Sequence, residues 1–98
     1  MEQVVKIAWT DTAKTALKSV FDFHAVNSEK SAHNIVDKIV KTADAIVFSK
    51  QYQLDDINPN YRRMISGHYK ILYKEKNSII SIMNVVSTKA NPDTLKYL

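Results

Sequence analysis

The chain has 98 residues, 45% of them hydrophobic, a formal net charge of +4 at pH 7 and no cysteine. A chain of this length folds as a single domain, residues 1–98, around one core, and without thiols it has neither a disulfide framework nor a thiolate metal site. No apolar run approaches the roughly 20 residues of a membrane span, and the first residues lack the pattern of a signal peptide, so we expect a soluble cytoplasmic protein without membrane contact.

The first half of the chain predicts one strand followed by two helices. Apolar residues dominate positions 4–9, which read as a strand, and Thr10 and Asp11 are good N-caps for a helix after it. Apolar residues then recur at helical spacing over positions 13–24, and again over positions 32–43 after a second cap at Asn27 and Ser28. Because few residues separate the two helices, they should form an antiparallel hairpin.

The second half predicts three strands. Gly67, the single glycine of the chain, suits a tight turn between antiparallel strands on either side of it. After this turn Tyr69, Ile71 and Tyr73 share one face of an alternating strand, with Lys70, Leu72 and Lys74 on the other, and the aromatic face is expected to face the core. Positions 79–86 are rich in β-branched residues and predict the last strand.

Positions 45–60 connect the two halves. Residues 51–60 read as a loop in which the carboxylates of Asp55 and Asp56 are solvated, whereas residues 45–53 fit either a helix extension or a strand. The resulting fold is an α+β domain of order β-α-α-β-β-β, in which the helical hairpin covers one face of the sheet and the last three strands form an antiparallel meander. The first strand is expected at an edge or beside the last strand.

Charge is divided unevenly along the chain. Residues 1–45 carry six lysines against six acidic residues, whereas residues 46–98 carry eight basic residues against four acidic ones. The strand half therefore holds the whole excess, which suits either an acidic partner or nucleic acid. An ordinary solvated basic face is the alternative.

The second half resembles the RelE/ParE superfamily of bacterial toxins, the toxic partners in type II toxin–antitoxin pairs. The matching features are Arg62 before the Gly67 turn, the aromatic-rich strand over residues 69–73, the hydrophobic strand over residues 79–86, and Lys89 followed by a short tail. The first half also fits that family's opening strand and helical hairpin. This resemblance implies a cognate antitoxin as partner, and as target either DNA gyrase, for the ParE branch, or mRNA on the ribosome, for the RelE branch.

The resemblance also implies site residues. Target binding falls to Arg62, Arg63, Lys70 and Lys89, with the two arginines at the surface. The catalytic candidates of a RelE-like nuclease would be Arg62, Lys70, Lys89, His68 and Tyr97. Lysine stands at positions 70 and 89, where the nucleases often carry arginine, and Leu95 stands where they carry a tail tyrosine. The ParE-like branch, which lacks that catalytic set, is therefore favoured, and whether the chain is an enzyme stays open.

The apolar stripe of the first helix is broader than one packing face needs, and Leu17, Val20, Phe21 and His24 are expected to bind the antitoxin. Histidines and carboxylates show no metal-ligand spacing, so neither a metal nor another cofactor is expected. A ribosome-dependent mRNA endonuclease and a non-toxic interaction domain of the same fold remain the alternatives. The sequence leaves the oligomeric state open, a homodimer included.

Overall fold

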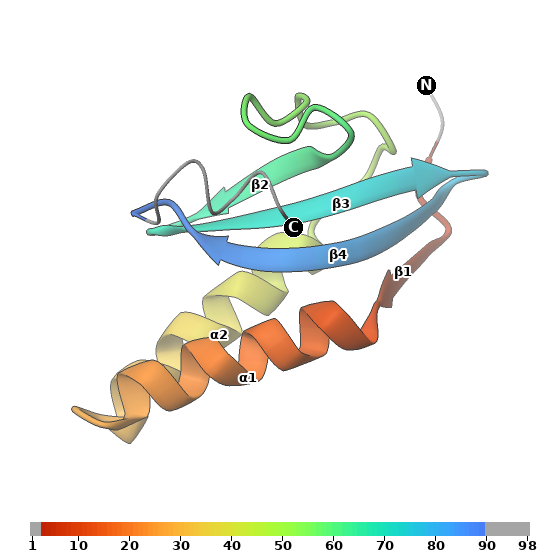
Figure 1. Cartoon of the computed structure of the whole chain (residues 1–98). Helices are drawn as coiled ribbons and strands as arrows, with labels where there is room; N and C mark the ends of the chain where they lie inside the picture. The colour runs from red at the N-terminus through yellow and green to blue at the C-terminus, as the bar shows by residue number, and fades with distance from the viewer. Residues whose placement is uncertain (1–2, 90–98) are drawn as a thin grey trace.

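The computed structural model describes residues 3–89 and shows a four-stranded sheet with two helices packed against one face (Figure 1). The elements are β1 (Lys6–Trp9), α1 (Asp11–Ala25), α2 (Glu29–Asp44), β2 (Arg62–Ser66), β3 (Tyr69–Lys76) and β4 (Ile79–Ser87). This order confirms the predicted α+β fold of one strand, a helical hairpin and three further strands. Within the described residues, neither helix combines the length and the apolar character that a membrane crossing requires.

The strand order of the sheet is β1-β4-β3-β2, so the first strand lies both at an edge and beside the last strand. β1 runs parallel to β4, with Lys6 opposite Ile79 and Trp9 opposite Ile82. β2, β3 and β4 form the predicted antiparallel meander. A parallel pair needs a long crossover connection, and the helical hairpin followed by β2 and β3 supplies it.

Hydroxyl side chains start both helices. Thr10 Oγ1 accepts a hydrogen bond from Ala13 N at 3.2 Å and donates one to Ile82 O at 2.8 Å. Thr10 therefore caps α1 and ties it to β4 at the same time. Ser28 Oγ accepts a hydrogen bond from Ser31 N at 3.1 Å and caps α2.

The core lies between the helical hairpin and the sheet. Its buried members are Ala13 and Val20 of α1, Ile39 and Ala43 of α2, Ile46 after α2, and Met64, Ile71, Tyr73, Ile80, Ile82 and Val85 of the strands. In β4 the core residues are Ile80, Ile82 and Val85, so their spacing changes from two to three. The register with β3 shifts at this point and leaves Met83 without a partner in β3. As predicted, Ile71 and Tyr73 are buried, and Tyr69 packs against the core.

The turns between the meander strands require unusual backbone conformations. Gly67 has φ +59°, and a Cβ added there would meet no atom within 4 Å. Backbone conformation, not lack of space, is therefore the reason for glycine at this turn, as predicted. In the other turn Asn77 and Ser78 both have positive φ, 52° and 65°, the pattern of a type I′ hairpin turn.

Residues 45–61 form a connection that neither extends α2 nor adds a strand. α2 ends at Asp44, and the sheet-like pairings of this segment with other described residues are single bridges of Phe48 with Gln3 and of Leu54 with Arg62. The predicted loop over residues 51–60 is confirmed, but it is not solvated throughout. Asp55 within it is only 2% exposed, because the connection folds back onto β2 and β3.

Candidate functional site

A shallow hollow, here called the α1 groove, lies between α1 and the sheet. It has a volume of about 370 Å³ and is lined by Ala16, Ser19, Val20 and Phe23 of α1 and by Tyr69, Val85 and Ser87 of β3 and β4. Phe23 is 73% exposed, and Val26, directly after α1, is 84% exposed. Exposed apolar side chains beside a groove are typical of a protein-binding surface.

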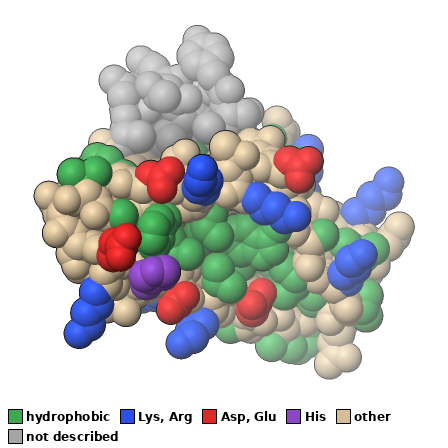
Figure 2. All heavy atoms as spheres, turned by 90° about the horizontal axis from the view of Figure 1, so that it is seen from below, with side chains coloured by type: hydrophobic (Ala, Val, Ile, Leu, Met, Phe, Trp, Pro, Cys, Tyr) green, Lys and Arg blue, Asp and Glu red, His purple; other side chains and the backbone are tan. Residues whose placement is uncertain are grey.

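The face formed by the two helices carries further apolar surface. Figure 2, which looks at the molecule from the helical side, shows hydrophobic side chains gathered along the middle of this face with charged side chains around them. Leu17 and Phe21 are partly buried, and the Phe21 ring lies 4.8 Å from that of His33 in α2. Val20 is nearly buried and forms part of the floor of the α1 groove.

The residues proposed from the sequence did not include Phe23, which lines the α1 groove. Those named for antitoxin contact were Leu17, Val20, Phe21 and His24, but Phe23 is far more exposed than Val20 and lines the groove beside it. The helical spacing of three residues from Val20 to Phe23 is the signal that would have found it, because residues three apart share a helix face.

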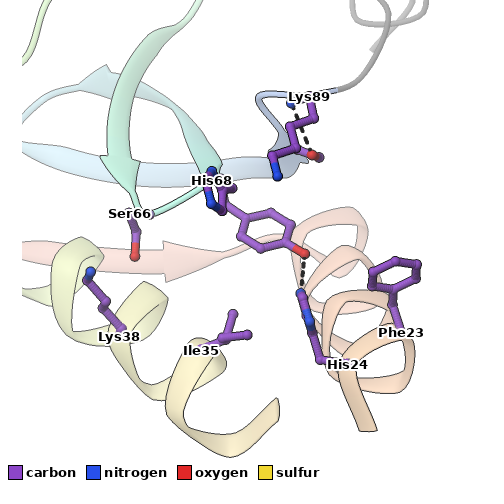
Figure 3. A pocket seen from close by; sticks show the side chains of 10 residues that line it. Phe23, His24, Ile35, Lys38, Ser66, His68 and Lys89 are labelled. Atoms are coloured by element: carbon purple, nitrogen blue, oxygen red, sulfur yellow. Dashed lines mark hydrogen bonds between the residues drawn. The ribbon is translucent and has the colours of Figure 1, made fainter. Parts of the chain in front are cut away.

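A second hollow, here called the basic cleft, lies between the helical hairpin and the β2–β3 turn (Figure 3). It has a volume of about 440 Å³. Its basic lining residues are His24, Lys38, His68 and Lys89, and its apolar ones are Phe23, Ile35 and Tyr69. Ser66, Gly67 and Ser87 complete it, so the described residues that line it include no carboxylate. Phe23, Tyr69 and Ser87 line both hollows, so the basic cleft adjoins the α1 groove.

A hydrogen bond between His24 and Tyr69 joins α1 to β3 at the boundary between these hollows. His24 Nε2 lies 2.6 Å from Tyr69 Oη, and the two rings meet edge to face with centroids 5.9 Å apart (Figure 3). Burial raises the pKa of Tyr69 above its ordinary value. The phenol is therefore neutral at physiological pH and holds the end of the helical hairpin against the sheet.

Asp55 binds four groups in the connection and the sheet. Its Oδ1 accepts a hydrogen bond from Lys70 Nζ at 2.7 Å, and its Oδ2 accepts from Ile57 N at 3.2 Å and Asn58 N at 2.8 Å. Arg63 Nη1 lies 3.6 Å from Oδ1. Burial alone would raise the pKa of Asp55, but the hydrogen bonds and the charge of Lys70 outweigh it and hold this pKa below its ordinary value.

This cluster corrects two expectations. The carboxylate of Asp55 was expected in solvent, but it is buried. It supplies the counter-charge that the buried ammonium of Lys70 needs. Lys70 was expected to bind the target, but it is 8% exposed and bound to Asp55. Arg63 Nη1 is additionally 3.4 Å from Asp56 Oδ2, so this guanidinium also faces the connection.

Arg62 is held by a different part of the connection. Its Nη1 donates a hydrogen bond to Tyr52 O at 2.8 Å. Its Nε lies 3.5 Å from Glu75 Oε2, which makes an ion pair, but Nε forms no hydrogen bond with any described residue. The side chain is 18% exposed, the same fraction as that of Arg63, so the two arginines lie partly at the surface and are held there by other groups of the domain. Lys89, by contrast, is exposed at the basic cleft.

The residues named for RNA cleavage are not assembled in the part of the chain that the structure describes. The register of β2 with β3 puts Arg62 on the helix side of the sheet and Lys70 on the other side, because cross-strand partners share a face. Only His68 and Lys89 line the same hollow. Tyr97 lies outside the described residues, as does the tail around position 95. Within residues 3–89, no group of histidines and carboxylates could hold a metal ion.

Comparison with protein-family models assigns the family. Residues 7–92 match the model described as the ParE toxin of the type II toxin–antitoxin system, parDE. The chain belongs to the ParE toxin family. A solved structure described as the chromosomal ParDE TA system from P. aeruginosa has the same fold, with a TM-score of 0.70 and 18% sequence identity over 84% of this chain and 94% of that chain. No curated relative matches the sequence.

Membership of the ParE family confirms the resemblance that the strand half suggested. The match covers β1 except Lys6, both helices and the whole meander, and so the chain is a toxin-family domain of the type II toxin–antitoxin class. Both hollows lie within the part that matches the ParE model.

Proposed function

We propose that this chain is a bacterial ParE-like toxin that inhibits growth in the cytoplasm, stabilises a plasmid or other genetic element, and is neutralised by a cognate antitoxin. The observation that carries this proposal is the exposed apolar surface beside α1 in a domain of the ParE family. Phe23 and Val26 together leave two large side chains in solvent, and burial of such surface by a partner is favourable by roughly 25 cal/mol per Å².

The antitoxin is proposed to cover the α1 groove. A groove of this kind suits an amphipathic segment whose apolar side chains repeat along one face. Val20 and Phe23 would contact such side chains directly. Leu17 and Phe21, which are partly buried, would lie at the edge of the contact. His24, which is hydrogen-bonded to Tyr69, would lie at the end of the groove.

DNA gyrase, not mRNA, is the proposed target. Metal-free RNA cleavage needs a proton carrier and fixed cations around one phosphate. Arg62 and Lys70 project from opposite sheet faces and are both bound to other groups of the domain. This separation favours inhibition by binding, with no chemical step. Of the proposed target contacts, Lys89 is exposed, Arg62 and Arg63 are each partly exposed, and Lys70 is buried.

An endonuclease of the RelE type is the second candidate, and one observation favours it. His68 and Lys89 line the same cleft, so a proton carrier and a cation lie near each other there. An oligomeric toxin, a homodimer included, is compatible with either function.

Controlled expression of the toxin without its antitoxin tests the proposal. Growth inhibition with blocked DNA supercoiling and intact mRNA is the expected result. Codon-phased mRNA cuts in primer extension, lost on Lys89→Ala, would replace it with the endonuclease. Normal growth with a correctly folded protein would favour a non-toxic interaction domain. Co-expression of the small protein encoded by the adjoining gene should restore growth.

A further inference from the structure

The basic cleft combines an apolar interior with an unbalanced positive rim. Lys38 projects from α2 and Lys89 follows β4, so the two lysines belong to different sides of the cleft (Figure 3). Both are exposed, and neither makes an ion pair with another described residue. Ile35 and Tyr69 supply apolar surface to the same lining. Two unpaired cations around an apolar hollow are complementary to a negatively charged, apolar ligand.

The neighbouring hollow restricts what that ligand is. The basic cleft and the α1 groove share Phe23, Tyr69 and Ser87, so a chain lying in the groove reaches the cleft without a gap. A single-stranded nucleic acid would pair phosphates with Lys38 and Lys89 and stack bases on Phe23. The described residues that line the adjoining α1 groove include no cation, so its phosphates would find no partner there. A peptide covers both kinds of surface, because apolar and acidic side chains alternate along one backbone.

We infer that the basic cleft binds an acidic stretch of the antitoxin, in which one large apolar side chain enters between Phe23 and Ile35 and flanking Asp or Glu residues pair with Lys38 and Lys89. This inference rests on the proposed function, in which an antitoxin covers the α1 groove. Beyond the proposed function, the inference specifies where the antitoxin segment ends on the toxin and which residues the segment carries at that end. The hydrogen bond between His24 and Tyr69 shapes the boundary over which the segment passes.

Titration calorimetry of the purified toxin with the purified antitoxin tests the inference. The variant Lys38→Glu/Lys89→Glu reverses the rim, and Lys50→Glu/Lys76→Glu makes the same change of net charge at exposed lysines outside the cleft. The rim variant should raise Kd by about 10- to 100-fold, and the control by less than about threefold. The dependence of log Kd on salt concentration should also become shallower in the rim variant only.

A second pair of variants tests the apolar part. Phe23→Ala should raise Kd about tenfold or more, because a central aromatic anchor carries a large share of interface energy. Val47→Ala, which truncates a 50% exposed apolar residue of the connection, should leave Kd unchanged. All six positions changed in these four variants are exposed, so circular dichroism should show the wild-type fold in every variant.

The possible results separate this inference from the proposed function. Equal affinity of the antitoxin for the wild type and the rim variant would overturn the inference and leave the proposed function intact. No affinity of the wild type for the antitoxin would remove both. In a parallel titration with a single-stranded RNA oligonucleotide, binding that only the rim variant loses, with antitoxin affinity unchanged, would overturn the inference in favour of a nucleic-acid site.

Discussion

Lys70 Nζ lies 2.7 Å from Asp55 Oδ1, and both side chains are almost completely buried. The carboxylate belongs to the connection after α2, and the ammonium belongs to β3. Their contact therefore fixes the connection on the sheet face that the helices do not cover. Two N–H groups of the connection, those of Ile57 and Asn58, donate to the same carboxylate and order the turn that carries it.

Replacement of Asp55 should strongly destabilise the domain. Asp55→Ala leaves the ammonium of Lys70 without a counter-charge and two N–H groups without an acceptor, and removal of one partner of a buried ion pair costs about 3–5 kcal/mol. Asp56→Ala is the matched control, because that side chain is 87% exposed and should change the free energy of unfolding by less than about 0.5 kcal/mol. Urea denaturation of both variants measures the difference, and equal midpoints would contradict the role given to Asp55.

Acid should remove the stabilisation that Asp55 provides. Its pKa in the folded protein lies below its ordinary value of 3.8, so the folded state favours the ionised carboxylate. The contribution is fully present above a pH of about 3.8 and is lost as the pH falls through the lower folded-state pKa. The difference in free energy of unfolding between wild type and Asp55→Asn should therefore shrink below that pH. Urea titrations from about pH 6 to about pH 2 test this, and a constant difference would contradict it.

Loss of the Tyr69 hydroxyl should loosen the end of the helical hairpin. Tyr69→Phe removes the 2.6 Å hydrogen bond to His24 and should cost about 0.5–1.5 kcal/mol. Amide exchange should become faster in the last turn of α1 while that of β4 stays unchanged. Tyr61→Phe is the control, since the Tyr61 ring contacts Lys74 and its hydroxyl has no partner among the described residues. Unchanged exchange in α1 would show that packing alone holds the hairpin.

Periodicity was sufficient to predict the fold. The helical spacing over residues 32–43 and the alternation after Gly67 are local properties of the sequence, and each specifies which face of its element is apolar. The place of the first strand, at an edge and beside β4, and its parallel direction needed the structure, because hydrophobic pattern does not determine strand order.

The sites were less predictable because they depend on how distant segments meet. Alternation along β3 places Lys70 on the face away from the core, but it does not reveal that the connection covers that face with Asp55. The basic cleft likewise requires Lys38, His68 and Lys89, from three separate segments, to converge. Their convergence is set by the packing of α2 against the sheet, which no single segment encodes.

Arg62 should stabilise the domain, and this role has to be separated from any contact with a target. Arg62→Ala removes the donor to Tyr52 O and the cation beside Glu75, which should lower the free energy of unfolding by about 1–3 kcal/mol. Lys89→Ala is the control, because Lys89 is exposed and its replacement should change that free energy by less than about 0.5 kcal/mol.

In growth assays, any loss of growth inhibition should have a different cause in each of these two variants. Arg62→Ala should inhibit growth less than the wild type in proportion to its lower folded fraction, and lowering the temperature should recover part of the inhibition. Lys89→Ala should reach the wild-type folded fraction at every temperature, so any loss of inhibition reports a lost contact. Urea denaturation and protein level in the same cells provide the comparison. Wild-type stability together with abolished inhibition in Arg62→Ala would instead make Arg62 a direct contact to the target, because a folding defect could not then account for the loss.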